Sequence, residues 1–195
     1  MVLDIAGRLG IRTGRLVAPT GIAATIAGAA LFVLPPHSTL AAIALGLAGI
    51  AAFALGTARQ AHGRWWALAA GAISAALLFA ALTVAGRGIA LHAFGTAETC
   101  TVTDRTMNET GVRYHHYGFV HTLTCETGTR TLRTDPGDRA ATGSTVTLLT
   151  DRGGLLEPDF AARHPLLLEV PAVLAGIALT TATIVLARRS VRSAN

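Results

Sequence analysis

Four long stretches of this sequence are almost free of charge and rich in small and aliphatic residues. They run over 16–34, 40–58, 65–85 and 166–187, and the one ionisable side chain within them is Glu169, near an end of the last stretch. The hydrocarbon core of a bilayer is ~30 Å thick and a helix rises ~1.5 Å per residue, so about 20 apolar residues span it. Because 19 apolar residues exceed a normal signal-peptide core, we expect the first stretch to be retained. The sequence therefore predicts four transmembrane helices, with the lipid bilayer as a partner.

The arginines indicate the orientation of these helices. The short segments 1–15, 59–64 and 188–195 carry eight of the 16 arginines, whereas the turn 35–39 carries no formal charge. The long segment 86–165 holds eight arginines against nine acidic residues. Short arginine-rich segments stay in the cytoplasm, and long loops are translocated whatever their charge. We therefore expect a cytoplasmic basic leader (1–15), a cytoplasmic basic tail (188–195) and an extracytoplasmic domain at 88–165.

Small residues recur at helical spacing within the apolar stretches. In a bilayer, helices associate mainly through close backbone approach, which small residues permit. The pattern favours a tight bundle and does not separate packing within one chain from homo-oligomerisation. The predicted packing positions are Ala42, Gly46, Gly49, Gly56, Gly71 and Gly176.

The segment 88–165 differs in character from the rest of the chain. Threonine is dense, apolar residues alternate with polar ones, and turn residues separate the runs. Such patterns predict β-strands, here over 97–104, 113–125, 129–134 and 144–150, with a turn at 108–111. The predicted fold class is thus a four-helix transmembrane bundle plus a small antiparallel all-β domain, a barrel or a sandwich.

Both cysteines of the chain, Cys100 and Cys125, fall in this domain. An even number of cysteines confined to an outward-facing domain predicts a structural disulfide. A hairpin that pairs Cys100 with Cys125 would centre its turn near residues 111–112, within reach of the expected turn residues.

The densest polar cluster is the run RYHHYGFVH. We predict a partner-binding surface there, made of Arg113, Tyr114, His116 and Tyr117. The alternation of a strand places His115 and His121 on one face, ~20 Å apart, which is too far to hold one metal ion. The weak metal-ligand candidates are His92, His115, His121 and His164. Histidines on a polar sheet surface are the simpler interpretation. No nucleophile elbow or paired catalytic carboxylate stands out, and we expect no cofactor.

The run CTVTDR … YHHYGFVHTLTCETGTRTLRTD … GSTVTLLTDRGGLLEPDFA resembles uncharacterised bacterial membrane proteins of the high-GC type with a small barrel-like ectodomain. The likeness covers about 70 of the 195 residues. It departs from the family pattern at Tyr114 and Tyr117, whose spacing is offset, and at Thr150–Gly153, which replaces the usual Tyr-Asp-Pro. The resemblance implies the small β-barrel fold and the outward location of this domain, and it supplies no catalytic residues. We expect the chain to lie in the bacterial plasma membrane.

These observations favour a non-enzymatic membrane protein whose outer domain binds another membrane or secreted protein. A toxin-immunity protein and an accessory subunit of an envelope complex are two forms of this function. One alternative is a membrane-embedded metal-handling protein or enzyme that uses the histidines above. A second is an oligomeric pore. Nucleic-acid binding is excluded, because no clustered basic face with stacking aromatics is present.

Overall fold

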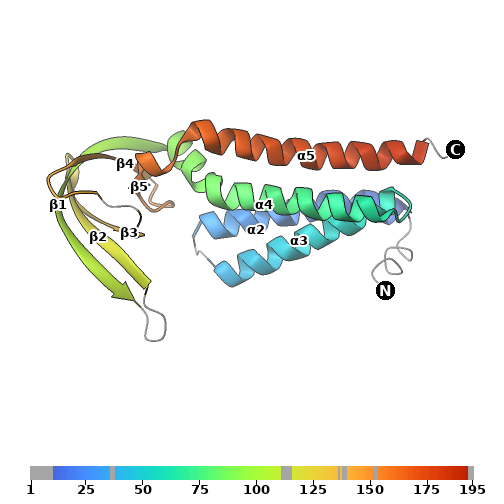
Figure 1. Cartoon of the computed structure of the whole chain (residues 1–195), viewed down its shortest axis with the longest axis horizontal. Helices are drawn as coiled ribbons and strands as arrows, with labels where there is room; N and C mark the ends of the chain where they lie inside the picture. The colour runs from blue at the N-terminus through green and yellow to red at the C-terminus, as the bar shows by residue number, and fades with distance from the viewer. Residues whose placement is uncertain are drawn as a thin grey trace. The chain divides into compact units, whose positions relative to one another are not determined.

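The computed structural model describes residues 11–35, 38–110, 116–135, 137, 140–151 and 153–192. The chain divides into two compact units, Met1–Ile89 with Leu166–Asn195, and Ala90–Pro165. The first unit is helical and the second is a β domain (Figure 1).

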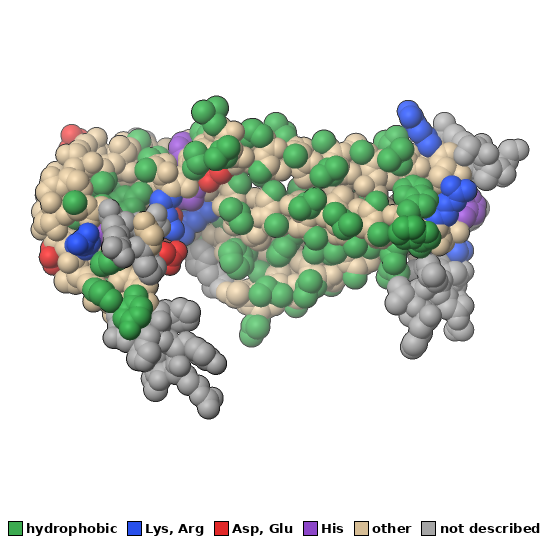
Figure 2. All heavy atoms as spheres, viewed as in Figure 1, with side chains coloured by type: hydrophobic (Ala, Val, Ile, Leu, Met, Phe, Trp, Pro, Cys, Tyr) green, Lys and Arg blue, Asp and Glu red, His purple; other side chains and the backbone are tan. Residues whose placement is uncertain are grey.

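The helical unit contains four long helices, α2 (Ile11–Val33), α3 (Thr39–Gln60), α4 (Trp65–Phe94) and α5 (Leu166–Arg192). Each is long enough and apolar enough to cross a bilayer. Hydrophobic side chains cover much of the visible surface of these helices (Figure 2). They include Leu40, Leu167 and Val84, which are 84%, 89% and 76% exposed. An apolar exterior of this kind suits a lipid environment.

The helix bounds extend beyond the predicted apolar stretches. Helix α2 already includes Ile11, and α4 continues nine residues past Ala85, through Arg87 and His92, to Phe94. The predicted start of the outer domain at residue 88 therefore lies within α4, and the first strand follows that helix directly. Hydropathy marks the part of a helix that fits the hydrocarbon core, not the point where its backbone hydrogen bonding ends.

Glycines let α2 and α3 approach closely. A Cβ atom added to Gly28 would lie 2.7 Å from the backbone nitrogen of Gly46, and one added to Gly56 would lie 2.6 Å from that of Ala18. Van der Waals contact requires more than 3 Å, so these positions hold no larger residue without moving the helices apart. The two helices thus pack backbone to backbone and antiparallel.

Hydroxyl groups connect α3, α4 and α5. Thr57 on α3 donates to the carbonyl oxygen of Ala67 on α4 at 3.1 Å, and Thr183 on α5 donates to the hydroxyl of Ser74 at 3.4 Å. Because the helices alternate in direction, the basic residues at the ends of α3, α4 and α5 lie at one end of the bundle (Figure 2). They are Arg59, Arg64, Arg188 and Arg189.

The β domain is a single curled antiparallel sheet of half-barrel form. Its strands are β1 (Gly95–Thr110), β2 (His116–Cys125), β3 (Gly128–Thr134), β4 (Thr145–Asp151) and β5 (Asp159–Phe160), in the order β3-β2-β1-β4-β5. A short 3-10 helix, η1 (Ala161–Arg163), follows β5. The core lies on the inner face and consists of Cys100, Val102, Leu123, Cys125, Leu132, Leu148 and Phe160.

The register of β1 on β2 differs from the predicted hairpin in one respect. Cys100 pairs with Cys125 as expected, but a bulge at Thr103 shifts all later pairs by one residue. The predicted turn at 108–111 is wrong in part, because Asn108 lies within β1 and pairs with Gly118. β-branched neighbours such as Thr106 and Val120 extend the ladder past the asparagine.

Candidate functional site

The two cysteines form the predicted disulfide. Cys100 and Cys125 lie directly opposite each other on β1 and β2, and their sulfur atoms are bonded. Cys100 is 1% exposed and Cys125 8% exposed. The disulfide is therefore a buried link across the centre of the sheet and confirms the prediction.

His121 is buried, not on the surface as the simpler interpretation held. Its side chain is 0% exposed, and Nε2 lies 3.1 Å from the hydroxyl of Thr134 on β3. The ring also meets that of Phe160 edge to face, at 5.7 Å between centroids. His121 shares the inner face with Leu123 and Cys125, and that face forms the core of the domain. Its role is structural packing with a satisfied ring nitrogen.

His164 lies beside a buried carboxylate. Its Nε2 is 3.2 Å from Oδ2 of Asp159, a residue that is 4% exposed. The other carboxylate oxygen accepts bonds from the amide of Phe160 at 2.8 Å and from Arg163 at 3.1 Å. This cluster ties the end of β5 to η1 and explains His164 without a metal ion.

The histidine candidates for a metal site do not come together in the described part of the chain. His92 is exposed in the last turn of α4, and His115 lies outside the described residues. Glu98, Cys100 and Cys125 are the group whose ligand atoms lie within 4.8 Å of one another among the residues that the structure describes. Because the two sulfurs are joined, this group offers no thiolate to a metal ion.

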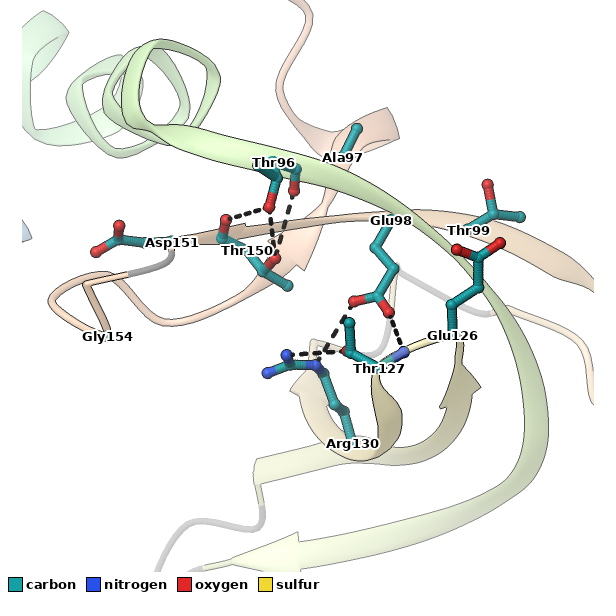
Figure 3. A pocket seen from close by; sticks show the side chains of 10 residues that line it. All are labelled: Thr96, Ala97, Glu98, Thr99, Glu126, Thr127, Arg130, Thr150, Asp151 and Gly154. Carbon is teal, nitrogen blue, oxygen red and sulfur yellow. Dashed lines mark hydrogen bonds and ion pairs between the residues drawn. The ribbon is translucent and has the colours of Figure 1, made fainter.

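A polar depression of about 600 Å³ opens at one end of the inner face (Figure 3). Glu98 points into it from β1, and its Oε1 accepts the backbone N–H of Thr127 at 2.7 Å. Its other oxygen lies 3.8 Å from Nε of Arg130. The bonds from Thr127, and to a smaller extent the charge of Arg130, hold the pKa of Glu98 below its ordinary value. Glu98 thus fastens the β2–β3 turn to β1.

Asp151, which also lines this depression, holds a loop in the same way, through hydrogen bonds to its carboxylate. Its carboxylate accepts the backbone N–H groups of Gly153 and Leu155, each at 2.9 Å, and of Leu156 at 3.3 Å. These bonds lower the pKa of Asp151. The carboxylates of Glu98 and Asp151 are therefore used to organise loops, and Glu126 is the third carboxylate that lines the depression in Figure 3.

Two of the four residues of the predicted partner-binding surface, His116 and Tyr117, belong to β2. Arg113 and Tyr114 fall outside the described residues, and only the backbone of His116 is described, at the start of β2. Tyr117 follows it and is 46% exposed. The structure therefore places one of the four predicted side chains, and that one is accessible.

Beyond the end of β4, β1 and β2 continue together as a ribbon, which β3 flanks on the β2 side as far as Phe119 (Figure 1). Strand β4 pairs with β1 over Gly95–Thr101, and β3 pairs with β2 as far as Phe119. On the inner face of the ribbon, Met107 lies opposite Phe119 and is 61% exposed. The guanidinium of Arg105 lies 5.2 Å from the centre of the Phe119 ring. Met107, Tyr117, Phe119 and Arg105 form an accessible apolar surface with one cation, which we call the ribbon face.

Sequence reasoning missed most of the ribbon face. It selected Tyr117 but not Met107, Phe119 or Arg105, because it followed the local density of polar residues. The alternation of β2 already placed Tyr117 and Phe119 on one face. Recognising Met107 and Arg105 required the register of β1 past the bulge at Thr103.

The small residues predicted for helix packing lie at contacts between helices. Ala42 is 0% exposed, and the Cβ positions of the others would meet a neighbouring helix within about 3 Å. Gly49 would meet Thr25 on α2, and Gly176 would meet Leu78 on α4. The remaining contacts are Gly46 with α2 and Phe79, Gly56 with Ala18, and Gly71 with Thr57.

Fold and site together define a class: a chain with four helices able to span a membrane and a disulfide-linked half-barrel domain that carries an exposed ribbon. Comparison with family models, with curated proteins and with solved structures gives no match for this chain.

Proposed function

We propose that this protein is a non-enzymatic binding protein of the bacterial plasma membrane. The four apolar helices anchor it, both termini lie in the cytoplasm, and the β domain captures a partner polypeptide outside the cell. An accessory subunit and a toxin-immunity protein both fit this proposal.

Two features support the orientation. The arginines at the end of α3, the start of α4 and the end of α5 gather at one end of the bundle, as expected for a cytoplasmic side. The Cys100–Cys125 disulfide belongs to an oxidising compartment, which lies on the opposite side of the membrane.

The ribbon face is the observation that carries the binding function. Met107 lies beyond the pairing of β1 with β4 and is 61% exposed, and Tyr117 lies beyond the pairing of β2 with β3 and is 46% exposed. Exposed aromatic and methionine side chains beside an arginine are the residue types enriched at protein interfaces. An adaptable methionine and an amphipathic tyrosine suit a polypeptide better than a small polar ligand.

The alternatives have less support in the geometry. His121 and His164 are already engaged by Thr134 and Asp159, so a metal-handling role loses two of its four residues. The glycines that an oligomeric pore would use contact helices of the same chain.

The experiment uses the full-length protein in membranes, with a photo-crosslinking amino acid at position 107 or 117. We expect each position to give a discrete adduct with a protein other than a second copy of this chain, and Tyr117→Ser should abolish the adduct formed from position 107. The matched control places the crosslinker at Leu155, which is also 61% exposed but lies in the loop after β4. Equal adducts from position 155, or none from positions 107 and 117, would contradict the proposal.

A further inference from the structure

One edge of β1 is open beyond the core. On one side β1 pairs with β2 along Cys100–Thr110, but on the other side its pairing with β4 ends at Thr101. One further contact involves Val102, which exchanges hydrogen bonds with Ser144 and Gly143 at 3.0 and 2.7 Å. Within the described residues no strand continues this side over Thr103–Thr110. Eight residues of extended chain present an edge about 26 Å long.

The register identifies which residues direct their backbone groups to this open side. Val102 faces β4, and its partner on β2 is Leu123, so Leu123 does not exchange hydrogen bonds with β1. By alternation along β2, the partners of His121, Phe119 and Tyr117 also face away from β2. These partners are Arg105, Met107 and Glu109.

A local bond agrees with this assignment. The backbone N–H of Arg105 donates to Oδ1 of Asp104 at 2.8 Å, as expected for a donor that the β1–β2 ladder does not use. An incoming strand would exchange this bond for one between chains.

We propose that a second copy of this chain covers the open edge, pairing β1 with β1 in antiparallel fashion about a two-fold axis at Met107. An isologous contact of this kind brings Met107 opposite itself and Arg105 opposite position 109 of the other copy, a glutamate, twice. The outward backbone N–H and C=O groups of Arg105, Met107 and Glu109 then form hydrogen bonds with the second copy. The result is one sheet that runs through both copies, in which the two ribbon faces are continuous.

Charge selects this register over its neighbours. An axis at Arg105 would bring the two guanidinium groups together, which is unfavourable for directly opposed residues. An axis at Thr106 puts Arg105 opposite Met107, and an axis at Asn108 puts it past the end of β1. The axis at Met107 matches each arginine with an acid and places the exposed methionines in mutual contact.

Formation of this dimer does not require the partner protein of the proposed function. We therefore test it in vesicles that contain only the purified full-length protein. In the variant Met107→Cys, the two cysteines occupy a hydrogen-bonded pair with Cα atoms about 5.5 Å apart, within disulfide range. We expect mild oxidation to give a covalent dimer. The matched control, Thr106→Cys, is also at an exposed position, but its two copies lie two positions out of register, beyond the reach of a disulfide.

A second measurement reverses the charges at positions 105 and 109 and follows the yield of covalent dimer. In the Met107→Cys background, Arg105→Glu should lower dimer yield about fivefold, because two attractive pairs become repulsive. Combining it with Glu109→Arg should restore the yield. Peptide mapping of the Cys100–Cys125 link verifies that each variant is folded. No dimer from Met107→Cys, equal dimer from Thr106→Cys, or no response to Arg105→Glu would overturn the proposal.

Discussion

Cys100 and Cys125 occupy directly opposed positions on neighbouring strands and are linked through their sulfur atoms, 25 residues apart in the chain. The link lies in the core beside Leu123 and Val102, and it joins β1 to the end of β2 where β3 and β4 flank the pair on both sides. The domain has a small apolar core, and a covalent link is a large part of the stability of such a domain.

Removal of this disulfide should destabilise the β domain. On the chain-entropy model, closing a loop of about 25 residues contributes roughly 3.5 kcal/mol. We expect Cys100→Ala with Cys125→Ala to lower the urea midpoint for proteolysis of the domain in the detergent-solubilised full chain. A double variant as resistant as the oxidised wild type would show that the link adds nothing.

Protonation of Glu98 should lower the stability of the β domain at acidic pH. Its pKa is lowered in the folded protein, so its contribution is present above the ordinary glutamate value of 4.5 and is lost as the pH falls through the lowered value. We expect Glu98→Gln to flatten the loss of stability below about pH 5, measured by proteolysis across pH. A Glu98→Gln profile as steep as that of the wild type would show that this carboxylate does not link stability to pH.

Asp151 should control the order of the loop that follows β4. Three backbone N–H groups donate to its carboxylate, and Asp151→Ala removes the acceptor for all three. Hydrogen exchange at Gly153, Leu155 and Leu156 should become faster by at least tenfold, whereas amides in β2 keep their protection. Unchanged exchange at these three amides would mean that other contacts hold the loop.

Substitution of a glycine at the α2–α3 contact, even by alanine, should destabilise the helix bundle. A Cβ at Gly49 would lie 2.5 Å from the backbone nitrogen of Thr25, whereas one at Gly86 would lie 3.7 Å from its nearest neighbour, Val33. We expect Gly49→Ala to destabilise the bundle by about 1–3 kcal/mol and Gly86→Ala to be neutral. Thermal unfolding in detergent compares the two, and equal melting temperatures would refute close packing at Gly49.

Much of the architecture follows from patterns that sequence reasoning detects well. Charge-free stretches of about 20 residues indicate helices that can span a bilayer. Strand alternation and the two cysteines were sufficient to pair Cys100 with Cys125. The resemblance to bacterial membrane proteins with small β ectodomains stays a prediction.

Other features depend on contacts that no local pattern reports. The ladder between β1 and β2 continues to Thr110 and His116, which places Asn108 within β1, and the bulge at Thr103 sets which residue lies opposite it. Strand β5 has only two residues, too few for a recognisable alternation. His121 looked like a surface residue because it lies in a polar run, yet it shares the core face with Leu123. The ribbon face becomes visible only when the ends of β3 and β4 are known.

Membrane orientation is the central claim, and thiol labelling in intact cells tests it most directly. The native cysteines are joined, so a single added cysteine reports its own location. Leu155→Cys lies in the β domain, and His62→Cys lies in the exposed turn between α3 and α4. A membrane-impermeant maleimide should label Leu155→Cys in intact cells and His62→Cys only after permeabilisation. Labelling of His62→Cys in intact cells, with Leu155→Cys protected until permeabilisation, would contradict the account.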